Sequence, residues 1–214
     1  MTRLEDTAER IHTAFVTRTA ARDRALTQAR TLTRHCANAI RAIHRDEAQV
    51  ASQNLLEAGK LAEELRGELA TYPDLYYAGY TQDALKEYAE ANLTNALINN
   101  KPLPGPEDLQ VEPSTYLQGL AEAVGDLRRR CLDTLLKGHS SEAARLLEEM
   151  DDIYAILVTM DYPDAITGGL RRLTDVARGI IERTRGDLTI SLRQERLENS
   201  LRELETRLDH TEQS

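Results

Sequence analysis

The stretch ARTLTRHCANAIRAIHR, residues 29–45, contains the pattern that decides the fold class. Its apolar residues recur every three or four positions, which is the period of an α-helix with one buried face. They are Leu32, Cys36, Ala39, Ile40 and Ile43. The same period returns along most of the chain, and no strand-like alternation of β-branched residues persists anywhere. The sequence therefore predicts an all-α protein.

Prolines divide this pattern into segments, because all six fall between helical stretches. The spacing predicts seven helices, over residues 4–45, 46–69, 83–98, 114–136, 140–159, 163–185 and 187–208. Asp46 and either Ser140 or Ser141 are the expected N-caps of the second and fifth helices, and Lys137-Gly138 is the expected end of the fourth. The proline-rich loop 99–112 is expected to be non-helical. We expect a single antiparallel seven-helix bundle domain over residues 1–214.

Composition limits the class of protein. The chain has 214 residues, of which 41% are hydrophobic and 29% are charged, and its net charge is −9. Any nucleic-acid surface must therefore be a local basic patch on an acidic body. The N-terminal residues include no signal sequence, and no apolar stretch is long enough to span a bilayer. We expect a cytoplasmic protein, with Cys36 and Cys131 as small core residues in a reducing compartment.

Several chemistries lack the residues that they need. The five histidines form no His-Glu-x-x-His motif and no Cys/His metal set. No serine lies in a nucleophile-elbow context, and there is no glycine-rich phosphate loop. The sequence therefore gives no support to classical hydrolase, kinase or dinucleotide-binding functions.

A row of arginines follows one face of the first predicted helix. Arg30, Arg34, Arg41 and Arg45 are spaced four, seven and four residues apart. At 100° per residue they fall within an arc of ~60°, opposite the apolar face, and cover about 22 Å of helix. We call this row the arginine stripe. It is a candidate track for the phosphates of a nucleic acid. The alternative is a solvated face with ion pairs to neighbouring helices.

Two predicted helices each carry a pair of carboxylates on one face. Glu87 and Glu90 are three residues apart, and Glu122 and Asp126 are four apart. If these helices pack together, the four groups can converge. A ligand set of oxygens alone favours Mg²⁺ or Mn²⁺ over zinc, and the bound metal could polarise a phosphate and activate a water molecule. The alternative is ordinary surface charge, since such pairs are frequent in helices rich in glutamate.

Leucines mark the last predicted helix, at Leu192, Leu197, Leu201, Leu204 and Leu208. The spacing of four, three and four residues at its end is typical of a helix-packing seam. Two interpretations are open, namely an intramolecular core face and an oligomer contact.

Two segments resemble motifs of the translin superfamily. DALKEYAEAN, residues 83–92, resembles the segment G-L-Q-E-Y-V-E-A of the RNase branch typified by translin-associated factor X (TRAX). YLQGLAEAVGDLRRRC, residues 116–131, resembles that family's Y-L-x-G-[VL]-A-D-x-x-G-E-L-x-R-x-C. The resemblance extends from the first helix to about residue 197. Residues 78–82 contain no basic side chain, unlike the non-catalytic translin branch, which places the chain nearer the nuclease branch.

The resemblance implies an all-α fold and a hollow homo-oligomer, of roughly six to eight copies, that binds single-stranded nucleic acid inside. In the catalytic branch, acidic residues of the two motifs hold Mg²⁺ and cleave RNA. Those positions correspond to Glu87, Glu90, Glu122 and Asp126. In the second motif the carboxylates differ in length from the family pattern, with glutamate at 122 and aspartate at 126. Arg129 lies on the same helix and joins the predicted nucleic-acid contacts.

The leading hypothesis from the sequence is a Mg²⁺- or Mn²⁺-dependent endoribonuclease for single-stranded RNA that works as a homo-oligomer. The first alternative is a non-catalytic, translin-like oligomer that binds single-stranded RNA or single-stranded DNA. The second alternative is a helical interaction protein, which only the leucine seam supports.

Overall fold

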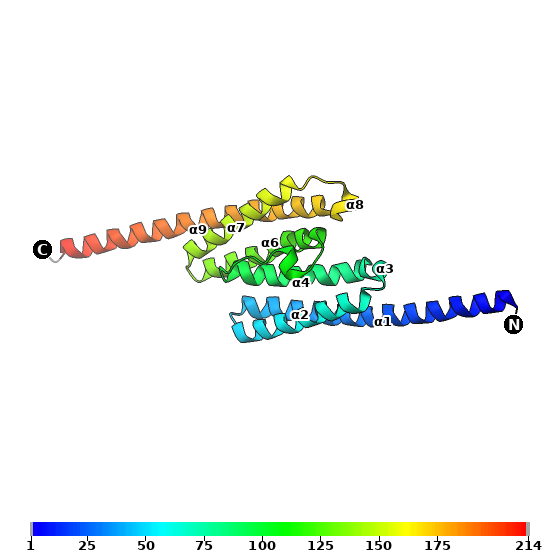
Figure 1. Cartoon of the computed structure of the whole chain (residues 1–214). Coiled ribbons are helices and arrows are strands. Elements are labelled where there is room, and N and C mark those ends of the chain that lie inside the picture. Colours follow the sequence, from blue (N-terminus) through cyan, green and yellow to red (C-terminus); the bar gives the residue numbers. More distant parts are fainter. Residues whose placement is uncertain (1, 213–214) are drawn as a thin grey trace. The chain divides into compact units, whose positions relative to one another are not determined.

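The computed structural model describes residues 2–212, with side chains described as far as residue 208. Every regular element in this part of the chain is a helix, as Figure 1 shows, so the all-α prediction is confirmed. The described residues contain nine helices instead of the predicted seven. None of these helices is both long and apolar enough to cross a membrane. The chain divides into two compact units, Met1–Ala123 and Val124–Ser214, and the expectation of a single domain stays a prediction.

The first unit is built around its long N-terminal helix, against which the second and fourth helices of the chain pack. Its elements are α1 (Arg3–His44), α2 (Ala48–Leu69), α3 (Pro73–Tyr76), α4 (Gly79–Ile98), α5 (Pro106–Leu109) and the first part of α6 (Pro113–Leu136). Leu32 and Cys36 of α1, Leu65 of α2 and Leu85 of α4 are completely buried. Alanines such as Ala39 are also fully buried, which lets the helices approach closely. The apolar face predicted for residues 29–45 is therefore the core face of α1.

The second unit contains the rest of α6, α7 (Ser140–Thr159), α8 (Asp164–Thr167) and α9 (Leu170–Glu212). Leu146 and Met150 of α7 are completely buried. Arg185 of α9 donates two hydrogen bonds, of 2.6 and 2.8 Å, to Asp151 of α7. Cys131 is free and buried, as predicted, and burial raises the pKa of its thiol to about 11. It is therefore a protonated core residue.

The predicted N-caps are wrong in both places. Asp46 lies in the turn before α2 with φ of 59°, and Glu47 takes the cap position without a side-chain hydrogen bond. His139 takes the cap position of α7, in place of either serine. The turn between α1 and α2 is so short that one residue must adopt the left-handed conformation, which aspartate tolerates better than most residues. Tertiary packing therefore decided these ends, over local capping preference.

The proline-rich loop contains one helical turn, α5, where no helix was expected. Pro106 is its first residue, a position where proline fits because its missing N–H would have no helical partner. The backbone N–H of Gly105 donates a 2.8 Å hydrogen bond to Asp108, which closes the turn. Gly138 has φ of 77° just after α6, so the predicted end of that helix is confirmed.

The last two predicted helices are wrong as separate elements, because α9 continues through Gly186. The break lies earlier, at Gly168 and Gly169, which have φ of 60° and 88°. A glycine inside a helix costs only about 1 kcal/mol relative to alanine, so packing elsewhere along α9 easily offsets it. A pair of glycines with positive φ does end a helix.

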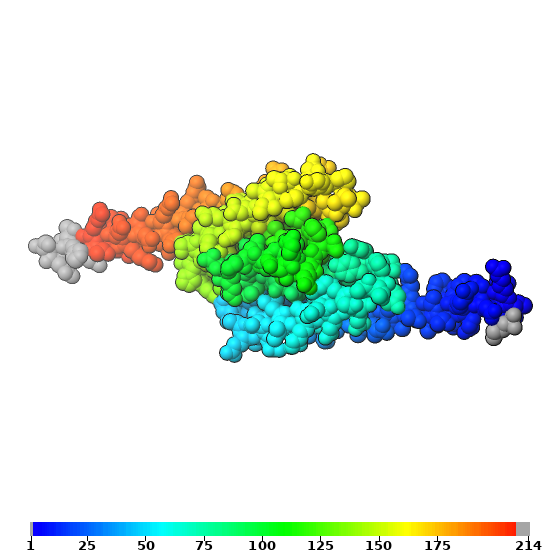
Figure 2. Space-filling view, viewed as in Figure 1, coloured from blue at the N-terminus to red at the C-terminus, as the bar shows by residue number. Residues whose placement is uncertain are grey.

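One end of each long helix extends beyond the other helices of its own unit, as Figure 2 shows for the dark-blue start of α1 and the orange-red end of α9. Residues 3–20 of α1 include no buried side chain, and neither do residues 189–208 of α9. These two ends therefore contribute little to the cores of their units.

Candidate metal centre

Helix α4 and the first part of α6 run side by side in the same direction. The hydroxyl of Thr115, near the start of α6, donates a 2.7 Å hydrogen bond to Gln82, near the start of α4. One turn further along both helices, Gly119 lies against residues 86–90. This pair is parallel, so the antiparallel prediction is wrong here. The connection of residues 99–112 is long enough to return the chain to the start of α4, because extended backbone covers about 3.3 Å per residue against 1.5 Å in a helix.

Gly119 brings the two helices into backbone contact. A Cβ atom added at Gly119 would lie 3.0 Å from the Cβ of Ala89, from the backbone nitrogen of Glu90 and from the carbonyl oxygen of Lys86. Such a contact is tighter than nine in ten real Cβ contacts, so any larger residue requires the two backbones to shift by a few tenths of an ångström. Glu122 lies one turn after Gly119, on the part of α6 that this contact holds against α4.

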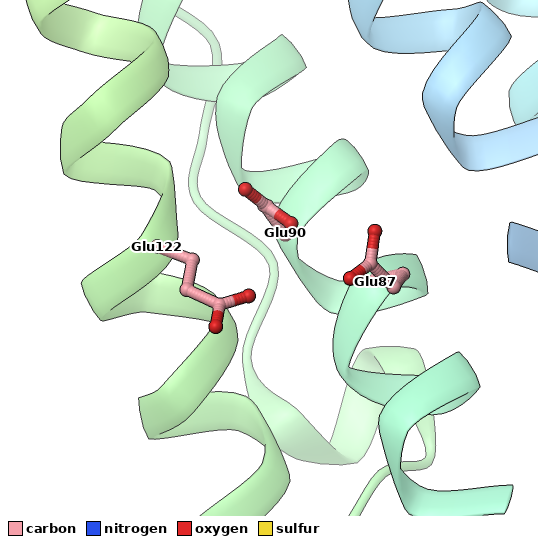
Figure 3. A group of neighbouring side chains, drawn as sticks. All are labelled: Glu87, Glu90 and Glu122. Atoms are coloured by element: carbon pink, nitrogen blue, oxygen red, sulfur yellow. The ribbon is translucent and has the colours of Figure 1, made fainter. Parts of the chain in front are cut away.

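Three glutamates meet across this contact. Glu87 and Glu90 come from α4 and Glu122 comes from α6, and one carboxylate oxygen of each lies within 4.8 Å of the others. In Figure 3, the Glu122 side chain reaches from its helix toward the two glutamates of α4. All three residues are half-buried. We call Glu87, Glu90 and Glu122 the glutamate cluster.

Lys86 places an ammonium group inside the glutamate cluster. Its Nζ lies 2.7 Å from Oε2 of Glu122 and 3.7 Å from Oε1 of Glu87. The Lys86 side chain is only 16% exposed, so water screens these interactions weakly. One positive charge therefore already compensates part of the negative charge of the cluster.

Burial and neighbouring charges set the ionisation of these groups. Burial raises the pKa of Glu87, the charge of Lys86 opposes this, and the charge of Glu122 adds to it. Burial alone would lower the pKa of Lys86, but its hydrogen bond to Glu122 and the negative charges around it raise the pKa overall. Cys36, on the neighbouring α1, has its pKa raised by burial and by the charges of Glu87 and Glu90. The thiol is therefore protonated and unreactive.

The donor set of the cluster fits a hard divalent cation. Carboxylate oxygens are the ligands that Mg²⁺ and Mn²⁺ prefer. Two oxygens on opposite sides of Mg²⁺ are about 4.2 Å apart, given Mg–O distances of about 2.1 Å. Three oxygens on one octahedral ion also include at least two adjacent pairs, which are about 3.0 Å apart. The carboxylates, which lie within 4.8 Å of one another, can therefore bind the ion after side-chain rotations that bring them closer. Glu87, Glu90 and Glu122 are the residues that would hold the ion.

Comparison with known proteins identifies the family. AfC3PO, solved as a complex with duplex RNA, is 35% identical to this chain, with a TM-score of 0.79 over 89% of this chain and 96% of AfC3PO. AfC3PO is a protein of the translin/TRAX type. This chain belongs to the translin superfamily. An uncharacterised protein of Methanocaldococcus jannaschii is 32% identical over 187 residues, which are 86% of this chain and 82% of that protein.

A more distant superfamily member shares the fold. Apo-NeC3PO is 21% identical and has a TM-score of 0.77 over 89% of this chain and 98% of NeC3PO. No family model matches the sequence. The resemblance inferred from residues 83–92 and 116–131 is thus confirmed by whole-chain comparison with solved structures of the superfamily.

The structure brings together three of the four predicted carboxylates. Asp126 follows Glu122 by one turn of α6 and belongs to the second unit. Arg129 also belongs to the second unit, where it is exposed. The roles of Asp126 and Arg129 at the site stay predictions.

The arginine stripe lies on the exposed face of α1. Arg30, Arg34, Arg41 and Arg45 are all exposed, and Arg41 donates a hydrogen bond to Asn38. Among the described residues, none of the four forms an ion pair with a carboxylate, which disfavours a row of structural salt bridges. Cys36 faces the other way, toward Glu87 and Glu90. In this translin-superfamily chain, the stripe and the glutamate cluster therefore lie on opposite sides of α1.

Sequence reasoning missed two residues of the site, Lys86 and Gly119. Gly119 offered a signal, since an isolated glycine within a helical pattern often marks a close contact. Lys86 offered little, because a lysine between acidic residues on a helix is normally solvated. Its importance depends on Glu122, which is 36 residues away in the sequence.

Proposed function

We propose that this chain is a Mg²⁺- or Mn²⁺-dependent endoribonuclease that works as a homo-oligomer, with single-stranded RNA as its substrate. The observation that carries the proposal is the glutamate cluster, in which three carboxylates from two helices converge within 4.8 Å. The relation to AfC3PO, a protein that has been solved with duplex RNA, supports RNA as the ligand.

A divalent cation in the glutamate cluster would supply the chemistry that phosphodiester hydrolysis needs. A divalent cation held by Glu87, Glu90 and Glu122 would polarise a phosphate oxygen and lower the pKa of a water molecule. Two of the three ligands sit one turn apart on α4, so the helix fixes their spacing. Glu122 depends on the α4–α6 contact at Gly119 for its position. Because these three residues are half-buried, their carboxylates stay partly accessible to solvent.

Lys86 has two roles in this proposal, namely to compensate charge and to position the substrate. Its ammonium compensates Glu122 when the carboxylates have no other cation. Once a cation shares these oxygens, the flexible lysine side chain can turn aside and donate hydrogen bonds to a phosphate next to the cluster. Lys86 would then help to position the substrate.

The arginine stripe supports binding of the RNA backbone away from the cluster. A helix with its side chains is about 10 Å thick, so one nucleotide cannot touch both faces of α1. In an oligomer, the stripe of one copy can bind a strand that reaches the cluster of another copy. A strand longer than a few nucleotides can also bind both surfaces of one copy. Asp126 and Arg129 complete the proposed set of functional residues.

The test is a cleavage assay with the purified protein on labelled single-stranded and double-stranded RNA, over a range of Mg²⁺ and Mn²⁺ concentrations. We expect products from single-stranded RNA that require the metal and disappear with EDTA. Replacing Glu87→Ala with Glu90→Ala removes two of three ligands and should abolish cleavage. Unchanged cleavage by this double variant would refute the proposed site.

The matched control is Glu63→Ala with Glu64→Ala on α2. Both of these glutamates are exposed, and their removal changes the net charge by the same amount. This control should cleave like the wild type, and circular dichroism should show that both double variants keep their helices. Preferential cleavage of double-stranded RNA would keep the metal site and refute the proposed substrate.

A second candidate function is a non-catalytic oligomer that binds single-stranded RNA or DNA. The short ion pair between Lys86 and Glu122 favours it, because the ammonium already compensates part of the negative charge that a metal ion would otherwise balance. Binding without products at every metal concentration would identify this function. A protein that neither binds nor cleaves oligonucleotides would instead be a helical interaction protein.

A further inference from the structure

A polar cavity lies in the first unit, where the ends of three helices meet. The end of α1, the start of α2 and the end of α4 form its walls. Its volume of about 280 Å³ is just below the range of ~300–1,000 Å³ that is typical of small-molecule sites. We call this cavity the helix-end pocket. The residues of the glutamate cluster are not among those that line it, so the proposed function leaves it unassigned.

Backbone hydrogen bonds fix two walls of the helix-end pocket. At the end of α1, the N–H of Glu47 donates a 2.9 Å hydrogen bond to the carbonyl oxygen of Ala42. At the end of α4, the N–H of Lys101 donates a 2.9 Å hydrogen bond to the carbonyl oxygen of Ala96. Each bond closes a Schellman motif, in which the preceding residue is left-handed. The pocket is therefore already formed in the free chain.

Two asparagines on the α4 wall present a hydrogen-bond donor and an acceptor. Nδ2 of Asn99 donates to the carbonyl oxygen of Asn95 at 2.9 Å and to its Oδ1 at 3.0 Å. These bonds orient both amides. They leave Nδ2 of Asn95 and Oδ1 of Asn99 without a partner among the described residues. Because both residues line the pocket, this donor and acceptor can pair with the edge of a nucleobase.

The charges around the pocket disfavour a simple ion as its ligand. Asp46 and Glu47 contribute two carboxylates to the wall, and Lys101 contributes an ammonium group. Arg45, which directly precedes Asp46, adds a second positive charge. Since the two signs balance, neither an anion nor a cation is strongly attracted. The ligand that fits has a neutral, polar part inside the pocket and a negative group outside it, which is the charge distribution of a nucleotide.

We propose that the helix-end pocket binds a nucleobase with an amino group beside an acceptor ring nitrogen, as in cytosine and adenine, from an RNA strand bound along the arginine stripe. Oδ1 of Asn99 accepts from the amino group and Nδ2 of Asn95 donates to the ring nitrogen. The carboxylate of Glu47, which has no partner among the described residues, accepts the second amino hydrogen. Uracil would instead place a carbonyl oxygen against these acceptors. The inference rests on the proposed function for RNA as the ligand, but it does not use the metal site.

The arginine stripe ends at the helix-end pocket. Arg45, its last member, directly precedes Asp46 of the pocket wall, and Arg41 lies one turn earlier on α1. Adjacent Cα atoms are about 3.8 Å apart, so a phosphate bound by Arg45 lies close to the wall. Contacts to phosphates position a strand without reading its sequence, whereas contacts to base edges do read it. The pocket therefore adds base recognition to the backbone binding that is proposed for the stripe.

Ligand-observed NMR of the full-length protein in EDTA tests the pocket with three probes, namely cytidine 5′-monophosphate, uridine 5′-monophosphate and ribose 5-phosphate. The two nucleotides have the same size and charge and differ at the base edge, and the sugar phosphate has no base. We expect the cytidine nucleotide to bind about tenfold more tightly than the uridine nucleotide, which is the lower end of discrimination by a paired base contact. Ribose 5-phosphate should bind most weakly. Equal affinities of the two nucleotides, or of ribose 5-phosphate and the cytidine nucleotide, would overturn the proposed base recognition.

Variants of the pocket wall locate the site. Asn95→Ala with Asn99→Ala removes both amides and should abolish the preference for cytidine. Gln49→Ala with Gln53→Ala is the matched control, because these exposed amides have the same four-residue spacing on α2 but do not line the pocket. Ser52→Phe fills the pocket from an exposed position and should weaken binding of both nucleotides while every amide is kept. Wild-type nucleotide binding by the asparagine variant and by Ser52→Phe, with helix content unchanged in circular dichroism, would overturn the inference.

Fluorescence anisotropy with oligocytidylate and oligouridylate of equal length, again in EDTA, distinguishes a base of a strand from a free nucleotide. We expect tighter binding of oligocytidylate, and we expect the asparagine double variant to bind the two strands equally. Equal binding of the two strands by the wild type, with the cytidine nucleotide still preferred, would assign the pocket to free nucleotides and overturn its place in strand binding. A protein that shows the strand preference but does not cleave RNA would refute the proposed nuclease and support this inference.

Discussion

At the scale of single residues, the ammonium of Lys86 decides how strongly the glutamate cluster can attract another cation. It lies 2.7 Å from Glu122 and competes with a metal ion for the same oxygens. Two unit charges about 4 Å apart interact by about 4 kcal/mol at an effective dielectric constant near 20. Partial exposure and salt reduce this value, but a remainder of only about 1.4 kcal/mol changes an affinity tenfold.

Lys86→Gln should therefore bind Mn²⁺ roughly tenfold more tightly than the wild type, because the internal positive charge is gone and glutamine keeps the hydrogen-bonding capacity. Electron paramagnetic resonance of free Mn²⁺ measures the affinity directly. Lys60→Gln is the matched control, since Lys60 pairs with Glu57 on the exposed surface of α2. Equal Mn²⁺ affinities in wild type and Lys86→Gln would show that the lysine does not occupy the cation position.

The raised pKa of Glu87 makes the stability of the metal-free protein depend on pH. Burial is the main cause of the raised pKa, so the folded protein holds this proton more tightly than the unfolded chain does. Stability contributed by protonated Glu87 is present at low pH and is lost as the pH rises from the ordinary glutamate pKa through the raised one. Glu87→Gln removes this loss, so its unfolding midpoint should exceed that of the wild type increasingly as the pH approaches neutrality.

Urea unfolding at a series of pH values, in the presence of EDTA, measures this difference. Glu64→Gln, on an exposed site of α2, should follow the wild-type curve at every pH. If the unfolding midpoints of wild type and Glu87→Gln differ by the same amount at every pH, the ionised carboxylate of Glu87 is fully compensated by Lys86.

At the scale of elements, the backbone contact between α4 and α6 determines whether the carboxylates can meet. The contact depends on Gly119, which has no side chain to separate the helices. Because Glu122 lies on the next turn of α6, a shift of this helix by a few tenths of an ångström moves its carboxylate by a similar amount. Metal sites lose affinity when ligands are displaced by a fraction of an ångström.

Gly119→Ala should destabilise the protein by about 1–3 kcal/mol, the usual range for overpacking, and should weaken Mn²⁺ binding although no ligand is changed. The control is Gly67→Ala on α2, where an added Cβ meets no atom within 4 Å. That substitution should stabilise the helix by about 0.5–1 kcal/mol. Thermal unfolding and Mn²⁺ titration of both variants test this, and Gly119→Ala with wild-type metal affinity would contradict the positioning role.

At the scale of the whole molecule, an acidic chain must bind RNA through a restricted basic surface. The arginine stripe is the candidate, since its four members are exposed and form no ion pair with a described carboxylate. Arg34→Ala with Arg41→Ala should weaken binding of a single-stranded RNA. It should also reduce the slope of log affinity against log salt by roughly 1.4, at about 0.7 per phosphate contact on a single strand.

Fluorescence anisotropy at several salt concentrations measures both quantities. Arg3→Ala with Arg10→Ala is the charge-matched control, because these exposed arginines lie on the same helix outside the stripe. The same salt slope in wild type and in the stripe variant would place the RNA surface elsewhere on the protein.

The sequence by itself determined the all-α class, the core face of α1 and the exposed arginine stripe. These features follow from the helical period, which one stretch of chain sets locally. The three glutamates of the cluster were singled out by the resemblance to motifs of the translin superfamily, because carboxylate pairs on one helical face are also frequent without a site. The predictions from the sequence were wrong for the N-caps of α2 and α7. They also missed the helical turn α5 and placed a helix boundary at Gly186, where α9 continues. At those positions, local preferences amount to about 1 kcal/mol and yield to packing.

Only the tertiary structure decided that α4 and α6 lie parallel, that Gly119 joins them and that Lys86 enters the cluster. It also showed that the leucine seam of α9 is exposed. Each of these facts depends on which face of one helix meets which face of another. Helical periodicity assigns a buried face to each segment but does not choose its partner, so contacts between residues as far apart as Lys86 and Glu122 exist only in the folded chain.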